Sequence, residues 1–86
     1  MRIELHKNFT KVYAKLTREI QEKFKERRDL FLENKFHPFL NNHSVGKTFS
    51  GCRSINVTGD YRAIFKENDD GSVVFMLIGT HSELYG

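Results

Sequence analysis

Several features that mark other classes of protein are scarce in this 86-residue chain. It has a single cysteine, Cys52, so no disulfide can form within the chain, which fits a reducing compartment. No apolar run approaches the ~20 residues of a membrane-spanning helix. The first six residues are too polar for a signal peptide. We therefore expect a cytoplasmic protein.

Proline is equally rare, and its position divides the chain. Pro38 is the only proline, and apolar residues recur at helical spacing before it and at strand spacing after it. The sequence also contains no repeat, low-complexity tract or linker, so we expect residues 1–86 to form a single domain. A domain of this size buries only a little over half of its unfolded surface, and it often depends on a partner for stability.

Positive charge is concentrated in the first part of the sequence. Residues 1–36 carry ten Lys or Arg against six Asp or Glu, whereas residues 37–86 carry four against five. A basic surface attracts a polyanion such as nucleic acid, or an acidic protein. The other values, 38% hydrophobic and 29% charged residues, are those of an ordinary globular domain and exclude disorder.

The first part of the chain predicts a strand followed by two helices. Residues 2–6 alternate polar and apolar side chains, which is typical of a short strand. Asn8 is expected to cap a helix that ends at about Leu16. Thr17 is expected to cap a second helix over residues 18–33, in which apolar side chains recur on one stripe and charges fill the opposite face.

The middle of the chain changes from helical to strand-like. Residues 34–43 are expected to be irregular, because Pro38 pushes the residue before it out of the helical region. Two segments with a period of two follow, and they predict strands over Cys52–Val57 and Tyr61–Lys66.

The last strand is expected to lie at the centre of a sheet. An Asp-Gly turn at residues 69–71 predicts a hairpin, and the nearly continuous apolar segment at residues 72–78 is typical of a strand covered on both faces. The expected fold class is α+β, in the order β-α-α-β-β-β. Two N-terminal helices pack on a small, mostly antiparallel, twisted sheet.

Two motifs in the C-terminal half carry a family resemblance. Residues 51–62 read GCRSINVTGDYR, and residues 79–86 read GTHSELYG. They resemble the RelE/ParE toxin superfamily, and the Gly-Thr-His segment with an aromatic residue four positions after the histidine is similar to its YafQ-like branch. The order of the expected elements agrees along nearly the whole chain, which implies a RelE-like fold.

The resemblance implies a toxin of a type II toxin–antitoxin system. Such a toxin is an mRNA interferase, an endoribonuclease that cleaves mRNA in the A site of the 70S ribosome without a metal. The ribose 2′-hydroxyl attacks the adjacent phosphate, and the 5′-oxygen leaves. The implied partners are a cognate antitoxin protein that covers the active groove, together with mRNA and ribosomal RNA, and no membrane is implied.

Four residues fall on functional positions of the YafQ-like pattern. His43 and His81 match its histidines, Asp60 matches its acidic residue, and Tyr85 matches its terminal aromatic. Histidine suits a general acid or base because its pKa lies near the working pH. The resemblance implies that all four are catalytic, with Tyr85 stacking on a base or orienting the scissile phosphate.

Two positions depart from that pattern. Asn56 stands where the pattern has a second histidine, and Leu77 stands where it has an arginine. Asn does not exchange protons at neutral pH, and Leu does not bind phosphate. We expect Arg62 to take the cationic role in catalysis, with Arg53 and Lys47 binding RNA, because each lies on a strand or loop of the predicted meander.

Each of these residues also has a structural explanation. An aspartate that follows a glycine in a turn, as Asp60 does, often bonds its own backbone. Arg62 has Asp60 and Glu67 as possible ion-pair partners. His81 lies in what reads as a loop, and Tyr85 is placed to close the core.

A metal site would be another use for several histidines. His37 and His43 are separated by five residues and His81 is distant, which matches no common zinc pattern, and Cys52 has no paired cysteine. We therefore expect no metal and no other cofactor.

Two alternative functions stay open beside the nuclease. One is a non-catalytic, ParE-like toxin that inhibits DNA gyrase by binding, and the other is a catalytically degenerate homologue. The histidines favour the nuclease, whereas Asn56 and Leu77 favour the alternatives.

Overall fold

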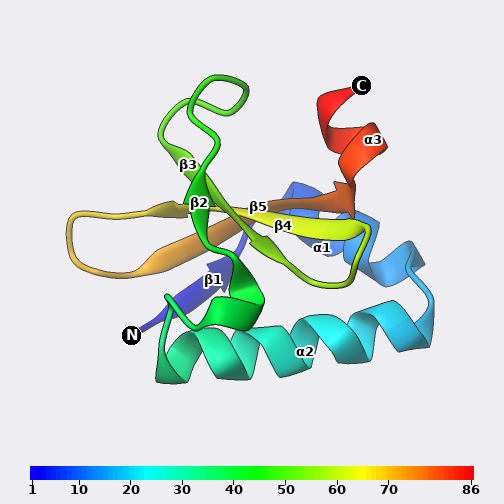
Figure 1. Cartoon of the computed structure of the whole chain (residues 1–86), viewed down its shortest axis with the longest axis horizontal. Coiled ribbons are helices and arrows are strands. Elements are labelled where there is room, and N and C mark those ends of the chain that lie inside the picture. The colour runs from blue at the N-terminus through cyan, green and yellow to red at the C-terminus, as the bar shows by residue number, and fades with distance from the viewer.

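The fold is a sheet with its two long helices on one face, as the computed structural model of residues 1–86 shows (Figure 1). The longest helix lies along one side of the sheet and the short C-terminal helix stands on the other, while the first helix lies behind the strands in this view and adds Phe9 to the same core as the longest helix. In chain order the elements are β1 (Ile3–Leu5), α1 (Lys7–Lys15), α2 (Arg18–Glu33), the 3-10 turn η1 (Pro38–Leu40), β2 (His43–Ser44), β3 (Cys52–Asn56), β4 (Tyr61–Glu67), β5 (Val73–Thr80) and α3 (His81–Tyr85).

The sheet has the strand order β1-β5-β4-β3-β2. Strands β2 to β5 pair antiparallel in sequence, whereas β1 pairs parallel with β5, so that Ile3 lies opposite Val73. The apolar strand β5 is therefore covered on both edges and lies inside the sheet, as its composition predicted. The expected α+β, mostly antiparallel architecture is confirmed.

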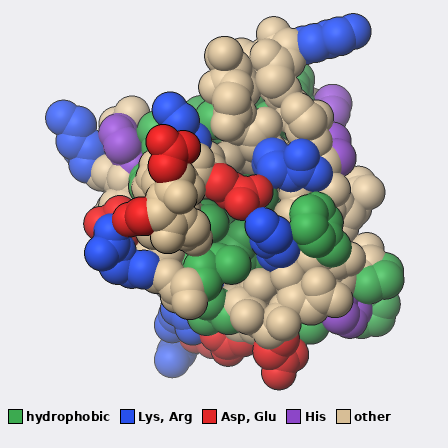
Figure 2. All heavy atoms as spheres, turned by 90° about the vertical axis from the view of Figure 1, so that its left-hand side faces the viewer, with side chains coloured by type: hydrophobic (Ala, Val, Ile, Leu, Met, Phe, Trp, Pro, Cys, Tyr) green, Lys and Arg blue, Asp and Glu red, His purple; other side chains and the backbone are tan.

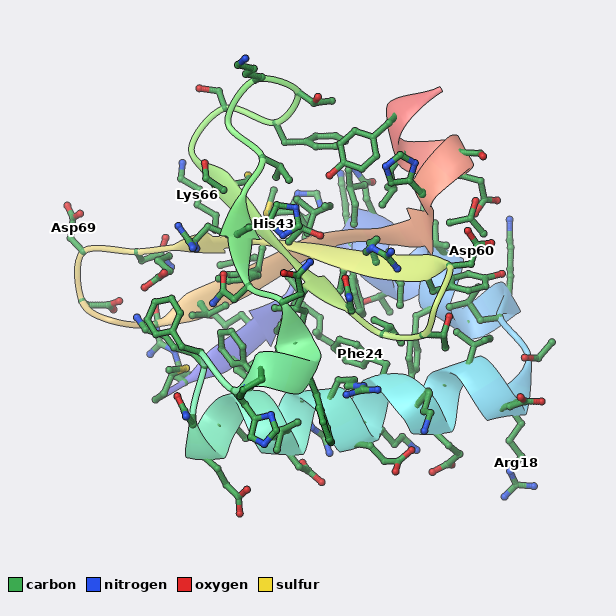
Figure 3. All side chains as sticks on the ribbon, viewed as in Figure 1. Arg18, Phe24, His43, Asp60, Lys66 and Asp69 are labelled. Atoms are coloured by element: carbon green, nitrogen blue, oxygen red, sulfur yellow. The ribbon has the colours of Figure 1, made fainter.

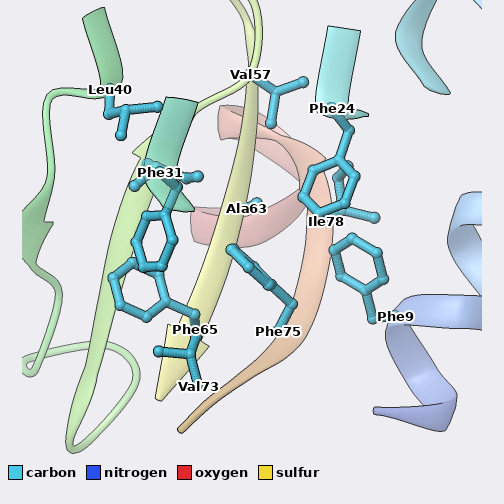
Figure 4. Close-up of a cluster of buried hydrophobic side chains, with 11 residues drawn as sticks. Phe9, Phe24, Phe31, Leu40, Val57, Ala63, Phe65, Val73, Phe75 and Ile78 are labelled. Atoms are coloured by element: carbon cyan, nitrogen blue, oxygen red, sulfur yellow. The ribbon is translucent and has the colours of Figure 1, made fainter. Parts of the chain in front are cut away.

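Phenylalanine side chains form most of the core between the helices and the sheet (Figure 4). Phe75 on β5 lies at the centre, fully buried. Its ring contacts four others, with centroid distances of 5.9 Å to Phe9, 5.3 Å to Phe24, 5.8 Å to Phe31 and 5.5 Å to Phe65. These rings come from α1, α2 and β4, so the apolar stripes of both helices meet the same face of the sheet.

The two N-terminal helix caps differ in how well the sequence predicted them. Thr17 caps α2 as expected, because its Oγ1 accepts a hydrogen bond from the backbone N–H of Ile20 at 3.3 Å. The prediction of Asn8 as the cap of α1 is wrong. The helix begins at Lys7, and His6 is the cap, with Nδ1 accepting from the N–H of Asn8 at 3.1 Å. The chain leaves β1 directly into this helix, so the extended residue at the junction is His6.

Two segments that read as loops contain regular structure. Residues 34–43 hold η1 and the first residue of β2, which pairs with β3 at the edge of the sheet. The expectation that residues 79–82 form a loop is wrong, because β5 continues to Thr80 and α3 begins at His81. None of the helices is both long enough and apolar enough to cross a membrane.

Candidate functional site

The largest cavity lies on the face of the sheet opposite α1 and α2. Side chains alternate along a strand, so Ser54 and Arg62 point away from the core that buries their neighbours Ile55 and Ala63. The loop between β2 and β3 rises on this side, as does α3 (Figure 1). Together they enclose a pocket of about 720 Å³, lined by Asn41, His43, Ser44, Val45, Gly46, Lys47, Thr48, Ser54, Arg62, His81 and Tyr85.

The charged residues of this pocket are all basic. Lys47 and Arg62 are permanent cations, His43 and His81 are titratable, and no Asp or Glu lines the pocket. Such a site is electrostatically suited to a polyanion.

The end of the molecule that carries the β4–β5 turn differs from the pocket in the charges of its side chains (Figure 2). There, side chains of both signs are intermixed, and they form ion pairs. Arg2 lies 3.9 Å from Glu4 and 3.7 Å from Asp70, and Lys35 lies 3.0 Å from Glu67. This contrast makes the pocket the candidate site for a phosphate-bearing ligand.

His43 is held in a defined orientation at the edge of the sheet. It lies on β2 (Figure 3), where it pairs with Ser54 on β3. Its Nδ1 lies 2.8 Å from the backbone oxygen of Asn41. A carbonyl oxygen only accepts, so Nδ1 must carry a hydrogen, and in the neutral ring Nε2 is the unprotonated nitrogen. Asn41 directs its carbonyl from a left-handed backbone conformation, with φ of 47°, that ends η1.

His81 and Tyr85 lie one turn apart on α3. Their ring centroids are 4.7 Å apart, and the ring of Tyr85 also contacts that of Phe49 at 5.8 Å. The imidazole of His81 is exposed and makes no hydrogen bond within the chain. Its backbone N–H donates to the carbonyl oxygen of Asp60 at 3.1 Å, which ties the start of α3 to the turn before β4.

Arg62 enters the pocket from β4 without an acidic partner. Its Nη1 donates to the backbone oxygens of Thr58 and Tyr61, both at 3.0 Å. The ion pair considered with Asp60 or Glu67 is absent. The Nε and Nη2 atoms make no hydrogen bond within the chain, so they are available to a ligand in the pocket.

Two of the residues singled out from the sequence do not line the pocket. Asp60 is exposed in the turn before β4 (Figure 3), and its carboxylate makes no hydrogen bond or ion pair. Arg53 points away from the cavity. Its Nε donates to the side-chain oxygen of Asn42 at 2.7 Å, and its guanidinium lies 5.9 Å from the ring centre of Phe36. The other five, His43, Lys47, Arg62, His81 and Tyr85, meet in one cavity.

The two departures from the family pattern occupy the same face of the sheet as the pocket. Asn56 is paired with Arg62 across β3 and β4, and its Oδ1 is buried without a hydrogen-bond partner. Leu77 is paired with Ile64. Ile64 is in turn paired with Ser54, and Ser54 with His43, so these four residues form one row across the strands. Neither Asn56 nor Leu77 lines the cavity.

Sequence reasoning missed the polar floor and rim of the pocket. Ser54 is buried with its Oγ unpaired, and Asn41 orients His43. The local sequence predicts neither role. That of Ser54 depends on how β3 pairs with its neighbours, and that of Asn41 depends on the backbone turn that ends η1. The sequence did contain a signal for helix α3, because Thr80 and Glu83 stand at the spacing of a helix capping box.

Comparison with known proteins gives a consistent family and fold. A family model described as the ParE toxin of type II toxin–antitoxin system, parDE, matches residues 3–85. The chain is similar to YafQ from E. coli strain BL21(DE3), with 26% identity, a TM-score of 0.79 and 100% of both chains covered. It is also similar to a chain of the E. coli DinJ–YafQ toxin–antitoxin complex, with 26% identity, a TM-score of 0.76, and 98% of this chain and 96% of that chain covered.

A more distant match supports the fold alone. The archaeal RelE–RelB complex from Pyrococcus horikoshii OT3 has a chain with 20% identity and a TM-score of 0.74, with 92% of each chain covered. No curated protein sequence matches the chain. The expected RelE-like fold and the resemblance to the YafQ-like branch are confirmed.

Proposed function

Because this chain belongs to the ParE toxin family of type II toxin–antitoxin systems, we propose that its single domain, residues 1–86, is a ribosome-dependent endoribonuclease. The observation that carries this proposal is the pocket, which two histidines and two cations line together with no carboxylate. These are the groups that cleavage of RNA requires when no metal takes part. The substrate is mRNA in the ribosomal A site.

His43 is the general base. Its Nε2, left unprotonated by the Nδ1 hydrogen bond to Asn41, takes the proton from a ribose 2′-hydroxyl. The 2′-oxygen then bonds to the adjacent phosphorus, and the bond from phosphorus to the 5′-oxygen breaks. The products are a 2′,3′-cyclic phosphate and a free 5′-hydroxyl.

His81 is the general acid that protonates the departing 5′-oxygen. It stands on α3 across the pocket from β2 and the loop that follows it. Its exposed ring has both nitrogens free of hydrogen bonds within the chain, so a protonated His81 has a donor to offer. Tyr85, whose ring lies beside His81, stacks on a base next to the scissile phosphate.

Arg62 and Lys47 stabilise the negative charge that develops on the phosphorane. Arg62 is fixed by the backbone oxygens of the turn before β4, so its free nitrogens need little reorganisation to bind phosphate. Asp60 contributes through its backbone oxygen, which holds the N–H of His81. We assign no direct contact with the scissile phosphate to the Asp60 carboxylate or to Arg53.

A cognate antitoxin is the proposed protein partner. One of the similar structures is the E. coli DinJ–YafQ toxin–antitoxin complex. An antitoxin that covers the pocket would withdraw the histidines and cations from RNA.

Inhibition of DNA gyrase is the second candidate function. It is favoured by the ParE description of the family model and by Asn56 and Leu77, which remove an acid/base group and a cation of the YafQ-like pattern. A protein of this kind would bind gyrase without cutting RNA.

Mapping of mRNA 5′ ends in a translating extract separates the two candidates. The wild-type protein is compared with His81→Ala, which removes the proposed acid and is expected to lower cleavage by ~10²–10⁴-fold. Cuts at defined codon positions that disappear in the variant support the nuclease. Intact mRNA with both proteins overturns it, and inhibition of gyrase supercoiling then becomes the assay to run.

A further inference from the structure

The helix that carries two of the proposed catalytic side chains is too short to be stable by itself. Helix α3 has five residues, His81–Tyr85, and isolated helices below about 12 residues are marginal in water. None of its residues is fully buried. Specific contacts at its start must therefore help to hold its position, in addition to the packing of Tyr85 on Phe49.

A reciprocal pair of hydrogen bonds supplies those contacts. The Oγ1 of Thr80 accepts from the backbone N–H of Glu83 at 3.2 Å, and the Oε1 of Glu83 accepts from the backbone N–H of Thr80 at 2.7 Å. This is a helix capping box. The hydrogen bonds from the backbone and side chain of Thr80 hold the pKa of the Glu83 carboxyl below its usual value, which shows that they favour the ionised form.

Gly79 leaves room for this arrangement. A Cβ atom at position 79 would lie 3.3 Å from the Oε1 of Glu83 and 3.5 Å from the Cδ2 of Leu84. The first distance is tighter than ordinary van der Waals contact, so a side chain here would require the Glu83 carboxylate to shift by a few tenths of an ångström. The backbone of β5 and the side chains of α3 thus pack closely at Gly79.

We propose that Thr80 and Glu83 are positioning residues that act through His81 and Tyr85. The capping box fixes the first turn of α3, which begins at His81, and so sets the direction in which both rings project into the pocket. The hydrogen bond from the His81 N–H to the Asp60 oxygen secures the same turn from the β4 side. The inference rests on the proposed nuclease function, since it concerns the acid of that reaction.

Two substitutions at Glu83 separate positioning from charge. Glu83→Gln keeps a side-chain oxygen that can accept from the Thr80 N–H, and Gln serves in capping boxes as Glu does. Glu83→Ala removes the acceptor. Asp70→Ala is the matched control, because Asp70 is also an exposed carboxylate bonded to a nearby backbone N–H, at 2.9 Å from Ser72, but lies at the β4–β5 turn outside the pocket.

The first measurement is amide hydrogen exchange in the free protein. The N–H of Gly86 donates to the oxygen of Ser82 at 2.8 Å and reports whether α3 is closed. We expect exchange at Gly86 to rise by about fivefold in Glu83→Ala, the scale of a lost helix cap, and to stay near the wild-type rate in Glu83→Gln and Asp70→Ala. The thermal midpoint of each variant is measured alongside, to show that the rest of the domain stays folded.

The second measurement is mRNA cleavage in the translating extract. Glu83→Ala is expected to lower the cleavage rate by about 10- to 100-fold, the cost of displacing a reacting group by an ångström or so, and Glu83→Gln to restore it. Unchanged exchange at Gly86 in Glu83→Ala would overturn the inference, and so would raised exchange with unchanged cleavage. Failure of the wild-type protein to cleave would instead overturn the proposed nuclease, while the exchange data still decide whether the box holds α3.

Discussion

The Nδ1 atom of His43 lies 2.8 Å from the backbone oxygen of Asn41, and this contact decides which ring nitrogen can act as a base. The hydrogen sits on Nδ1, so Nε2 holds the free lone pair. Asn41 provides the oxygen from a backbone conformation that few residue types adopt without strain, with φ of 47°. Asparagine is among those that tolerate it.

His43→Ala is expected to lower mRNA cleavage by ~10²–10⁴-fold, because it removes the proposed general base. The rate of appearance of mapped 5′ ends in a translating extract measures this. His37→Asn is the control, since His37 lies outside the pocket and its Nδ1 caps η1 by accepting from Phe39 at 3.1 Å, a role that asparagine also fills. Equal losses of cleavage in both variants would show that the His43 substitution acts by disturbing the fold and not by removing a general base.

Leu77→Arg is expected to leave cleavage equal or higher. Leu77 is half-buried on the pocket's face of the sheet, in the row that leads to His43, and an arginine there would add a cation for phosphate. Leu77→Met, a swap that conserves volume, is the matched control and should behave like wild type. A large loss of cleavage in folded Leu77→Arg would place Leu77 in the apolar packing beside Phe49 instead.

Phe75→Ala is expected to lower the free energy of unfolding by about 3–5 kcal/mol, the range for truncating a buried aromatic ring. The ring is fully buried and contacts four other phenylalanines, so the cavity would have few ways to collapse. Phe36→Ala, at a ring that is 59% exposed, should change it by about 0.5 kcal/mol or less. Urea denaturation of both variants tests the contrast.

Asp70 is expected to stabilise the fold at neutral pH and to lose this effect in acid. Hydrogen bonds from the side chain and the backbone N–H of Ser72 lower the pKa of Asp70 below 3.8. A carboxyl whose pKa is lower in the folded state contributes stability above its unfolded pKa, and this is lost as the pH falls through the folded pKa. The difference in unfolding free energy between wild type and Asp70→Asn should therefore shrink below pH 3.8.

Urea midpoints at about pH 7 and about pH 2.5 measure this difference. Asp69→Asn is the neighbouring control, because the Asp69 carboxylate makes no hydrogen bond or ion pair in the same turn. A difference for Asp70→Asn that is constant over the whole range would contradict the expected role of Ser72.

The local periodicity of apolar residues was enough to predict the main helix and the inner strand of this protein from its sequence. The spacing of apolar residues gave the helix at residues 18–33 with its Thr17 cap, and the apolar run gave β5 as an inner strand. The Gly-Thr-His segment and its aromatic residue gave the family and two residues that line the pocket. These features are local, because each depends on residues that lie close together in the sequence.

Tertiary structure alone decided which of the chemically suitable residues meet. Strand pairing places Arg62 on the pocket face, while Arg53 projects to the other side of β3 and bonds Asn42. The carboxylate of Asp60 stays outside the cavity, although its backbone oxygen holds His81. Side chains on a strand alternate between faces, so a shift of one residue in register exchanges the set that enters the pocket. Pairing between strands sets that register, and contacts between distant segments, such as Phe31 with Phe65, set the face that the helices cover. Local sequence patterns do not encode those contacts.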